Sequence, residues 1–277
     1  MMAFYPLEVL EVRAETRDAV AVTLAPPAEA EEAFSFRHGQ YLTFRRDFDG
    51  EELRRSYSIC AAPGEALRVG IKRVQGGAFS SWAHGELQPG DMIEAMPPAG
   101  RFTHDLVPDA GRHYLGFAIG SGITPVLSIV KTVLRGEPLS RFTLVYGNRS
   151  ATSIMFREEL EDLKNRYLGR LNLIHILKND AQEVDLFTGR IDAEKCERLF
   201  AGLVDVKGAD LAFICGPEGM MKTVSAALQA HGMAEDRIRY ELFGAAQPGR
   251  ARVAAVDAAT IEAGASARIT MDGATRE

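Results

Sequence analysis

Four consecutive residues, Arg55-Ser56-Tyr57-Ser58, present groups that could bind a ligand. The guanidinium of Arg55 can bind an anion, the ring of Tyr57 offers a flat stacking surface, and the Ser58 hydroxyl can form a short hydrogen bond. Together these groups suit a ligand that joins a planar ring system to phosphates. The alternative is an ordinary solvated strand end, and the neighbouring motifs must decide between the two interpretations.

A second motif, Gly76-Gly77-Ala78-Phe79-Ser80, precedes a short helix-like stretch at 81–84. Paired glycines followed by a serine can present several N–H groups and a hydroxyl to a diphosphate. We count Lys72, in the strand just before this motif, among the candidate cofactor-binding residues. A plain glycine turn explains this motif equally well.

A third motif, Gly120-Ser121-Gly122-Ile123-Thr124-Pro125, lies between an expected strand and an expected helix. Free N–H groups and the helix dipole make such a turn a phosphate site, and Gly120 and Gly122 allow the backbone to approach the ligand. Thr124 can cap the helix and Pro125 can open it. The alternative is a tight strand-to-helix turn without a ligand.

The next expected strand ends in Tyr146-Gly147-Asn148-Arg149-Ser150. A carboxylate at this place suits the ribose hydroxyls of NADH, whereas an arginine suits the 2′-phosphate of NADPH. Arg149 with Ser150 therefore favours NADPH. The alternative is a solvated surface arginine.

Two later strands end in further candidates, Cys215-Gly216-Pro217 and Glu241-Leu242-Phe243. The carboxyl ends of parallel strands share one edge of the sheet, so we expect both groups near the same ligand. Glu241 could handle a proton, and Phe243 could cover a planar ring. The alternatives are a buried structural cysteine and a core aromatic residue beside a surface carboxylate.

Short alternating runs up to about residue 105 must position the first two motifs. Apolar residues alternate in 7–9 and 20–24, and further strands are expected at 41–48, 52–60, 66–74 and 91–96, with Asp49-Gly50 as a hairpin turn. We predict a six-stranded antiparallel Greek-key β-barrel in residues 1–108.

From residue 112 onward strands alternate with helices. Apolar strands are expected at 113–119, 141–146, 170–177, 210–215 and 237–243, and helices include 151–167 and 217–231. Five strands joined by four helical crossovers predict a parallel doubly wound α/β domain over residues 109–243. Residues 244–277 are expected to form a linker followed by one strand and the turn of a hairpin, without its second strand.

Composition restricts the class of protein. A net charge of −6 and an isoelectric point near 5.6 give no reason to expect binding to nucleic acid or to a membrane. The N-terminus has no secretory pattern, and neither the three cysteines, Cys60, Cys196 and Cys215, nor the histidines show metal-ligand spacing. We therefore expect a cytoplasmic protein without a metal site, and its oligomeric state stays open.

In their order and spacing, the motifs RSYS, GGAFS, GSGITP, YGNRS, CGP and ELF resemble the ferredoxin–NADP⁺ reductase superfamily across residues 5–243. Within it the chain is most similar to reductase components of multicomponent oxygenases, and the stretch YGNRSATSIMFREELEDLKNRY resembles the phenylacetyl-CoA epoxidase type. This resemblance implies FAD held by Arg55, Tyr57, Ser58, Gly77 and Ser80, and NADPH held by residues of the 120–125 and 146–150 motifs. Ser58, Cys215 and Glu241 would flank the place of hydride transfer.

The resemblance has one large departure. Such reductases carry a C-terminal ferredoxin domain whose [2Fe–2S] cluster needs a Cx4CxxC run and a later cysteine, and this sequence contains no such run. The expectation is a truncated or naturally short form whose electrons go to an iron–sulfur or diiron acceptor protein. Two alternatives are a stand-alone ferredoxin or flavodoxin reductase and a non-catalytic flavoprotein scaffold.

Overall fold

The computed structural model describes residues 3–243 together with 269–271 and 274–276. Its first half is an antiparallel sheet of six strands. They are β1 (Tyr5–Thr16), β2 (Ala19–Ala25), β3 (Tyr41–Phe48), β4 (Glu51–Ser58), β5 (Leu67–Lys72) and β6 (Met92–Ala95). The hairpin between β3 and β4 turns on Asp49 and Gly50, both with positive φ, which is the two-residue turn expected from the sequence.

The strand order β4-β3-β6-β1-β2-β5 confirms the predicted six-stranded antiparallel arrangement. The edge strands β4 and β5 approach each other at an isolated bridge between Ile59 and Val69, and the sheet stays open between them in the part of the chain that the structure describes. A hydrophobic core that includes Leu7, Val22 and Phe44 fills its interior, and helix α1 (Ala78–Gly85) adds Phe79 and Trp82 to that core.

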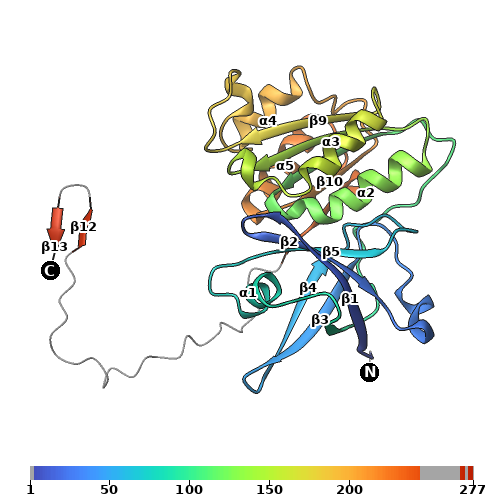
Figure 1. The fold of residues 1–277 in the computed structure, drawn as a ribbon. Helices are drawn as coiled ribbons and strands as arrows, with labels where there is room; N and C mark the ends of the chain where they lie inside the picture. Colours follow the sequence, from blue (N-terminus) through green and yellow to red (C-terminus); the bar gives the residue numbers. More distant parts are fainter. Residues whose placement is uncertain (1–2, 244–268, 272–273, 277) are drawn as a thin grey trace.

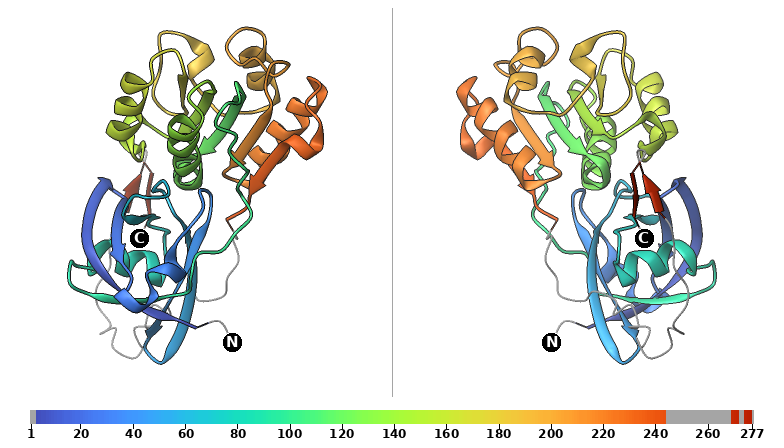
Figure 2. Two further views of the ribbon diagram at one scale, coloured as in Figure 1. Left: turned by 90° about the vertical axis from the view of Figure 1, so that its right-hand side faces the viewer. Right: turned by 90° about the vertical axis from the view of Figure 1, so that its left-hand side faces the viewer.

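The second half confirms the expected parallel sheet, with strand order β11-β10-β7-β8-β9. Helices cover both faces of this sheet (Figures 1 and 2). The strands are β7 (His113–Ile119), β8 (Arg141–Asn148), β9 (Leu171–Leu177), β10 (Leu211–Cys215) and β11 (Ile238–Glu241), and the helices are α2 (Ile123–Gly136), α3 (Arg157–Arg166), α4 (Ala193–Phe200) and α5 (Glu218–Ala230). The order reverses between β7 and β10, which is where open α/β sheets bind ligands.

Three details differ from the sequence-based expectations. The helix predicted over 151–167 begins only at Arg157, because Phe156 adopts a left-handed conformation with φ 56°. Thr124 does not cap α2: it lies inside the helix and its hydroxyl donates to the carbonyl of Ser121. The strand Ile269–Met271 (β12) does have a partner, Ala274–Arg276 (β13), whereas the predicted linker at 244–268 lies outside the described residues.

Polar contacts from α2 and α3 join the α/β domain to the barrel. Lys131 of α2, only 4% exposed, forms ion pairs with Glu65 of the barrel and Glu159 of α3. Arg68 of β5 binds the same Glu159 carboxylate, and the Ser128 hydroxyl donates to the Ala61 carbonyl. These contacts fix how the α/β domain sits on the barrel.

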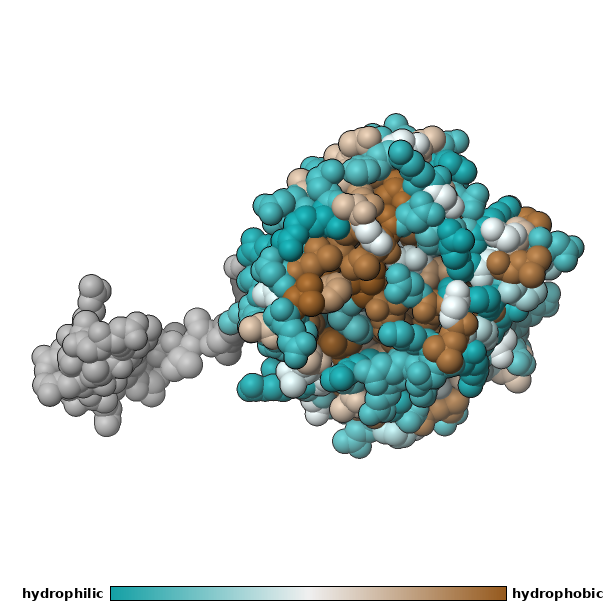
Figure 3. Space-filling view, turned by 90° about the horizontal axis from the view of Figure 1, so that it is seen from above, coloured by the Kyte–Doolittle hydropathy of each residue, from teal (hydrophilic) through white to brown (hydrophobic). Residues whose placement is uncertain are grey.

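The face of the α/β domain that points away from the barrel has a hydrophobic central area surrounded by hydrophilic side chains (Figure 3).

No helix in residues 3–243 combines the length and apolar character needed to cross a bilayer. In the same residues no three histidine, cysteine or acidic side chains gather as a metal site would require.

Candidate functional site

Two adjoining cavities lie between the barrel and the carboxyl edge of the parallel sheet. Cavity A, of about 890 Å³, is lined by Asp18, Lys72, Arg73, Val74, Gln75, Gly76, Ser81, Ile119, Gly120, Ser121, Gly122, Asn148, Arg149, Gly216, Pro217 and Phe243. Cavity B, of about 730 Å³, is lined by Tyr41, Arg55, Ser56, Tyr57, Ser58, Gly70, Lys72, Val74, Gln75, Gly76, Gly77, Phe79, Ser80, Ser121, Thr124, Glu241, Leu242 and Phe243. The two cavities share lining residues, Lys72 and Phe243 among them, so they adjoin each other.

The barrel side of cavity B contains the first two sequence motifs. The Tyr57 ring packs against Phe79, with ring centroids 5.7 Å apart, so the tyrosine rests on a rigid aromatic base. Phe79 itself is 1% exposed and acts mainly as that base. The Ser80 hydroxyl accepts a hydrogen bond from the Val74 amide, which holds the glycine turn against the start of α1.

One hydrogen bond crosses cavity B from the barrel to the α/β domain. Ser58 at the end of β4 donates its hydroxyl to Glu241 Oε2 at the end of β11, over 3.0 Å. Burial raises the pKa of Glu241 to about 7, and the bond from Ser58 only partly offsets this effect. The Glu241 carboxyl can therefore hold or release a proton near neutral pH.

Residues of the 120–125 turn line both cavities. Gly120 adopts a positive φ of 56°, and no neighbouring atom prevents a side chain there. Gly122 serves a different purpose: a Cβ atom on it would lie 2.2 Å from the carbonyl oxygen of Cys215. This glycine is therefore required by the contact between the turn and the end of β10.

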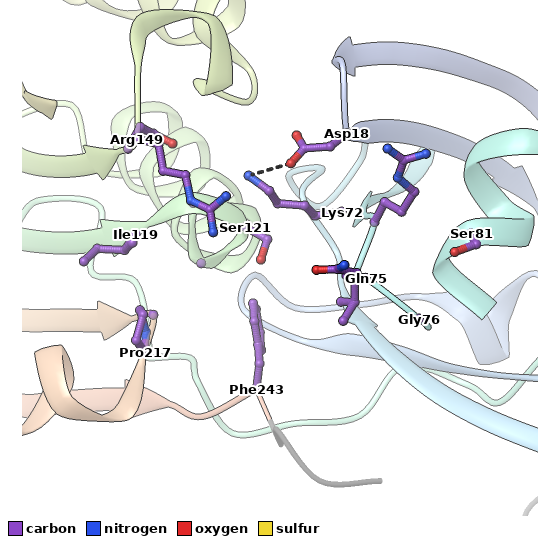
Figure 4. A pocket seen from close by; sticks show the side chains of 16 residues that line it. Asp18, Lys72, Gln75, Gly76, Ser81, Ile119, Ser121, Arg149, Pro217 and Phe243 are labelled. Carbon is purple, nitrogen blue, oxygen red and sulfur yellow. Dashed lines mark ion pairs between the residues drawn. The ribbon is translucent and has the colours of Figure 1, made fainter. Parts of the chain in front are cut away.

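Cationic side chains enter cavity A from both domains. Arg149 reaches in from the end of β8 and Lys72 from the end of β5, and the two point toward the same space (Figure 4). Lys72 also forms an ion pair with Asp18, with 3.6 Å between Nζ and Oδ2. The pocket is therefore suited to an anionic ligand that touches both domains.

Asn148 gives a second indication of a ligand in cavity A. Its residue is 7% exposed, and neither atom of its amide group finds a hydrogen-bond partner in the part of the chain that the structure describes. An unpaired buried amide costs about 1–3 kcal/mol, so a ligand that supplies the missing partners is favoured here.

Several predicted residues do not reach either cavity. Tyr146 is fully buried and donates its hydroxyl to the Gly120 carbonyl, so in this structure it supports the turn. Cys215 is also fully buried, and burial together with the Glu241 charge raises the pKa of its thiol well above the ordinary value. Pro125 is buried within α2, and Ser150 exchanges hydrogen bonds with Ser153.

The sequence motifs missed other lining residues, notably Asp18, Gln75 and Tyr41. Gln75 directly precedes the Gly76-Gly77 pair, so a wider window around that motif would have found it. Asp18 lies in the turn between β1 and β2, far from any motif, and no local signal marks it.

Two family models match the chain along its length. An oxidoreductase FAD-binding domain matches residues 6–104, and an oxidoreductase NAD-binding domain matches residues 117–226. Together with the observed pair of sheets, these matches define the class: the chain is an oxidoreductase built from a FAD-binding domain and an NAD-binding domain.

Relatives place the chain more closely. It is 46% identical to a component of the 1,2-phenylacetyl-CoA epoxidase of Escherichia coli, over 88% of this chain and 68% of that protein. It is 35% identical to the ferredoxin reductase component of 3-ketosteroid-9-alpha-monooxygenase from Rhodococcus rhodochrous, over 86% of this chain and 64% of that protein. The FAD/NAD-binding domain of nitric oxide dioxygenase from Vibrio cholerae has the same fold, with a TM-score of 0.73, 24% identity, and coverage of 87% of this chain and 98% of that one.

The chain therefore belongs to the ferredoxin-reductase family of FAD- and NAD(P)-binding oxidoreductases that includes these reductase components of oxygenases. It spans about two thirds of the length of the two relatives described.

Proposed function

We propose that this protein is an NADPH-dependent reductase that passes electrons through FAD to an acceptor protein. The observation that carries this proposal is the pair of adjoining cavities between the FAD-binding and NAD-binding domains, with cationic side chains in one and a supported tyrosine ring in the other. Two ligands that must exchange electrons need such adjoining sites.

The residues of cavity B suit FAD. Tyr57 presents a ring face on a packed base, Arg55 and Ser56 line the same wall, and Gly76, Gly77 and Ser80 surround the start of α1. A Cβ atom on Gly77 would lie 2.9 Å from Ser80 Oγ, so a side chain would fill the turn that we assign to the diphosphate. When bound, FAD supplies the chemistry: it takes a hydride from NADPH and releases electrons singly.

The residues of cavity A suit NADPH. The unpaired Asn148 amide, Arg149, and the turn at 120–122 lie together at the carboxyl edge of β7 and β8. Arg149 at the end of β8 is placed to bind a 2′-phosphate, which favours NADPH over NADH. Gly216, Pro217 and Phe243 border the opposite side and would help to exclude water from the reacting rings.

Ser58 and Glu241 are the residues that we assign to the reacting end of the site. Their hydrogen bond spans the two domains at 3.0 Å, and Glu241 holds its proton near neutral pH because it is buried. We assign to this pair the orientation of the ring system and the control of a proton beside it. Cys215 lies at the end of β10 on the same edge of the sheet and is fully buried, so we assign it a supporting role.

For the acceptor we propose an iron–sulfur or diiron component of an oxygenase, because one relative is a subunit of an epoxidase and another is the ferredoxin reductase component of a monooxygenase. The relative with 46% identity is part of an epoxidase that acts on phenylacetyl-CoA, and we extend this pathway to the present chain as part of the proposal. We also propose Arg149 as the residue that distinguishes the two pyridine nucleotides.

The first test is the purified protein. We expect a yellow protein that releases FAD on denaturation and that reduces ferricyanide with NADPH. A protein that binds no flavin, or that binds FAD and is not bleached by NADPH without oxygen, would overturn the proposal.

The second test is the variant Arg149→Glu, with Asp109→Asn as an exposed control outside both cavities. We expect the Km for NADPH to rise about tenfold or more and the Km for NADH to change little, because only NADPH loses a charge-assisted contact. Equal losses with both nucleotides would remove Arg149 from the 2′-phosphate role.

A further inference from the structure

Asp18 is the one carboxylate among the described residues that line cavity A, which otherwise presents three cations, Lys72, Arg73 and Arg149. It lies in the turn between β1 and β2, so the barrel places a negative charge in the lining of a cavity suited to anions. A charge of the wrong sign in a binding site needs an explanation, because it repels every phosphate that enters.

Local contacts hold this carboxylate in place. The Thr16 hydroxyl donates to Asp18 Oδ1 over 2.8 Å, and the Asp18 carbonyl accepts from the Arg73 amide over 2.7 Å. Burial, which raises the pKa of Asp18, is outweighed by the Thr16 hydrogen bond and the Lys72 charge, so its pKa lies below the ordinary value and the group is ionised at neutral pH.

Its partner Lys72 lines both cavities. The ion pair directs the ammonium group toward cavity A, where Figure 4 shows Asp18 and Lys72 side by side facing Arg149. An ammonium group has three N–H donors and Asp18 can use only part of that capacity, so Lys72 can still bind a phosphate while it is held.

We propose that Asp18 limits the affinity of cavity A for anions, because its charge offsets part of the attraction that Lys72, Arg73 and Arg149 exert on a phosphate. This inference rests on the proposed function, since it takes cavity A as the site of the pyridine nucleotide. The Asp18 charge thereby weakens the binding of a highly charged nucleotide. The effect is larger for NADP⁺ than for NAD⁺ because NADP⁺ carries an extra phosphate.

The experiment is calorimetric titration of the FAD-loaded protein with NADP⁺ and with NAD⁺. We compare the parent with Asp18→Asn, which can keep the bond from Thr16 but loses the charge, and with Asp18→Glu, which keeps the charge. Asp109→Asn makes the same change of net charge on the exposed surface outside the cavities.

We expect Asp18→Asn to bind NADP⁺ about threefold or more tightly at low salt, with a smaller gain for NAD⁺. The gain should shrink in about 0.5 M salt, which screens charges over a few ångströms. Asp18→Glu should stay near the parent, and Asp109→Asn should not change the affinity. Only a charge effect predicts this dependence on salt and on the number of phosphates.

Failures of the two proposals are distinguishable. If the parent binds neither nucleotide, the proposed function is wrong. If the parent binds NADP⁺ and Asp18→Asn binds it equally or more weakly at low salt, the role of Asp18 as a limit on affinity is wrong while the proposed function stands.

Discussion

At the scale of single residues, the hydrogen bond between Ser58 and Glu241 shows how burial creates a reactive group. Its partners are 183 positions apart in the chain and come from different domains. Removal from water disfavours the charged carboxylate, and this effect exceeds the stabilisation by the serine hydroxyl. The shift is therefore a property of the closed interface between the domains.

The raised pKa of Glu241 predicts a pH dependence of stability. The folded protein binds this proton more tightly than the unfolded chain, so the contribution of Glu241 to the unfolding free energy should fall as pH rises from about 4.5 to about 7. The total effect is on the order of 3 kcal/mol. Other groups titrate in this range as well, so the quantity to measure by urea unfolding is the difference in unfolding free energy between the parent and Glu241→Gln, which should decline across it. The exposed control Glu235→Gln should show no such decline in its difference from the parent, and a constant difference for Glu241→Gln would contradict the assignment.

Gly122 provides a second prediction at this scale. Gly122→Ala places a methyl group 2.2 Å from the Cys215 carbonyl oxygen, so the turn or the end of β10 must move. We expect a loss of about 1–3 kcal/mol in thermal or urea unfolding, together with weaker nucleotide binding. Gly219→Ala, where no atom lies within 4 Å, is the matched control and should cause no loss. Equal stability of the two variants would show that the turn is not fixed by this contact.

At the scale of elements, α2 and α3 are tied to the barrel by an ion-pair network centred on Lys131. The pairs Lys131–Glu159 and Arg68–Glu159 connect α2, α3 and β5. Gly70 on β5 leaves the room that these helices need, because a Cβ atom there would lie 2.6 Å from Thr124. The position of the 120–125 turn above cavity B therefore depends on this interface.

We predict that Lys131→Met destabilises the protein by about 3–5 kcal/mol, because it leaves two partly buried carboxylates with reduced compensation. Urea unfolding is the measurement. The control is Arg157→Met, which breaks the exposed pair Arg157–Glu161 and should cost less than about 0.5 kcal/mol. If the two variants lose the same amount, the network does not hold the domains together.

At the scale of the whole molecule, a histidine pair lies where the connection leaves the barrel. His38 Nε2 and His104 Nδ1 are 3.1 Å apart, and the His104 ring also packs on Tyr114 and Phe213 of the α/β domain. Burial lowers the pKa of His38 to about 3 and that of His104 to about 4, although Asp105 and Glu137 act in the opposite direction. The neutral pair is therefore part of the folded state.

This pair predicts sensitivity to acid. The unfolded chain takes up protons at these positions below about pH 6.5 while the folded protein does not, so the contribution of the pair to stability should fall as pH drops from 6.5 toward 4, opposite in sign to that of Glu241. Each histidine contributes on the order of 1 kcal/mol per pH unit. In urea unfolding, His38→Gln should flatten this slope and His84→Gln, far from the pair in sequence, should not. The slope should become smaller in His38→Gln without disappearing, because His104 remains; an unreduced slope would assign the acid sensitivity to other groups.

Local sequence patterns were sufficient for the order of strands and helices. Period-two alternation, the Asp49-Gly50 turn and the glycine motifs are short-range signals, and each predicts its own element without knowledge of the rest. The carboxyl-edge rule for parallel strands then groups the motifs at 120–125, 146–150 and 241–243 at one edge of the sheet. The late start of α3 escaped this reasoning, because the left-handed residue Phe156 is held by a bond from its amide to Glu15 of the barrel.

The sequence by itself therefore predicted the two domains and identified the residues of the nucleotide-binding motifs. The folded arrangement decides which of these residues line cavity A: Arg149 and Asn148 do, whereas Tyr146 and Cys215 are fully buried. The folded arrangement also brings Asp18 into the lining of cavity A and raises the pKa of Glu241. The physical reason is range: periodicity and turns depend on neighbours in the chain, whereas burial, charge pairing and access depend on contacts between residues more than fifty positions apart, such as Asp18 and Lys72.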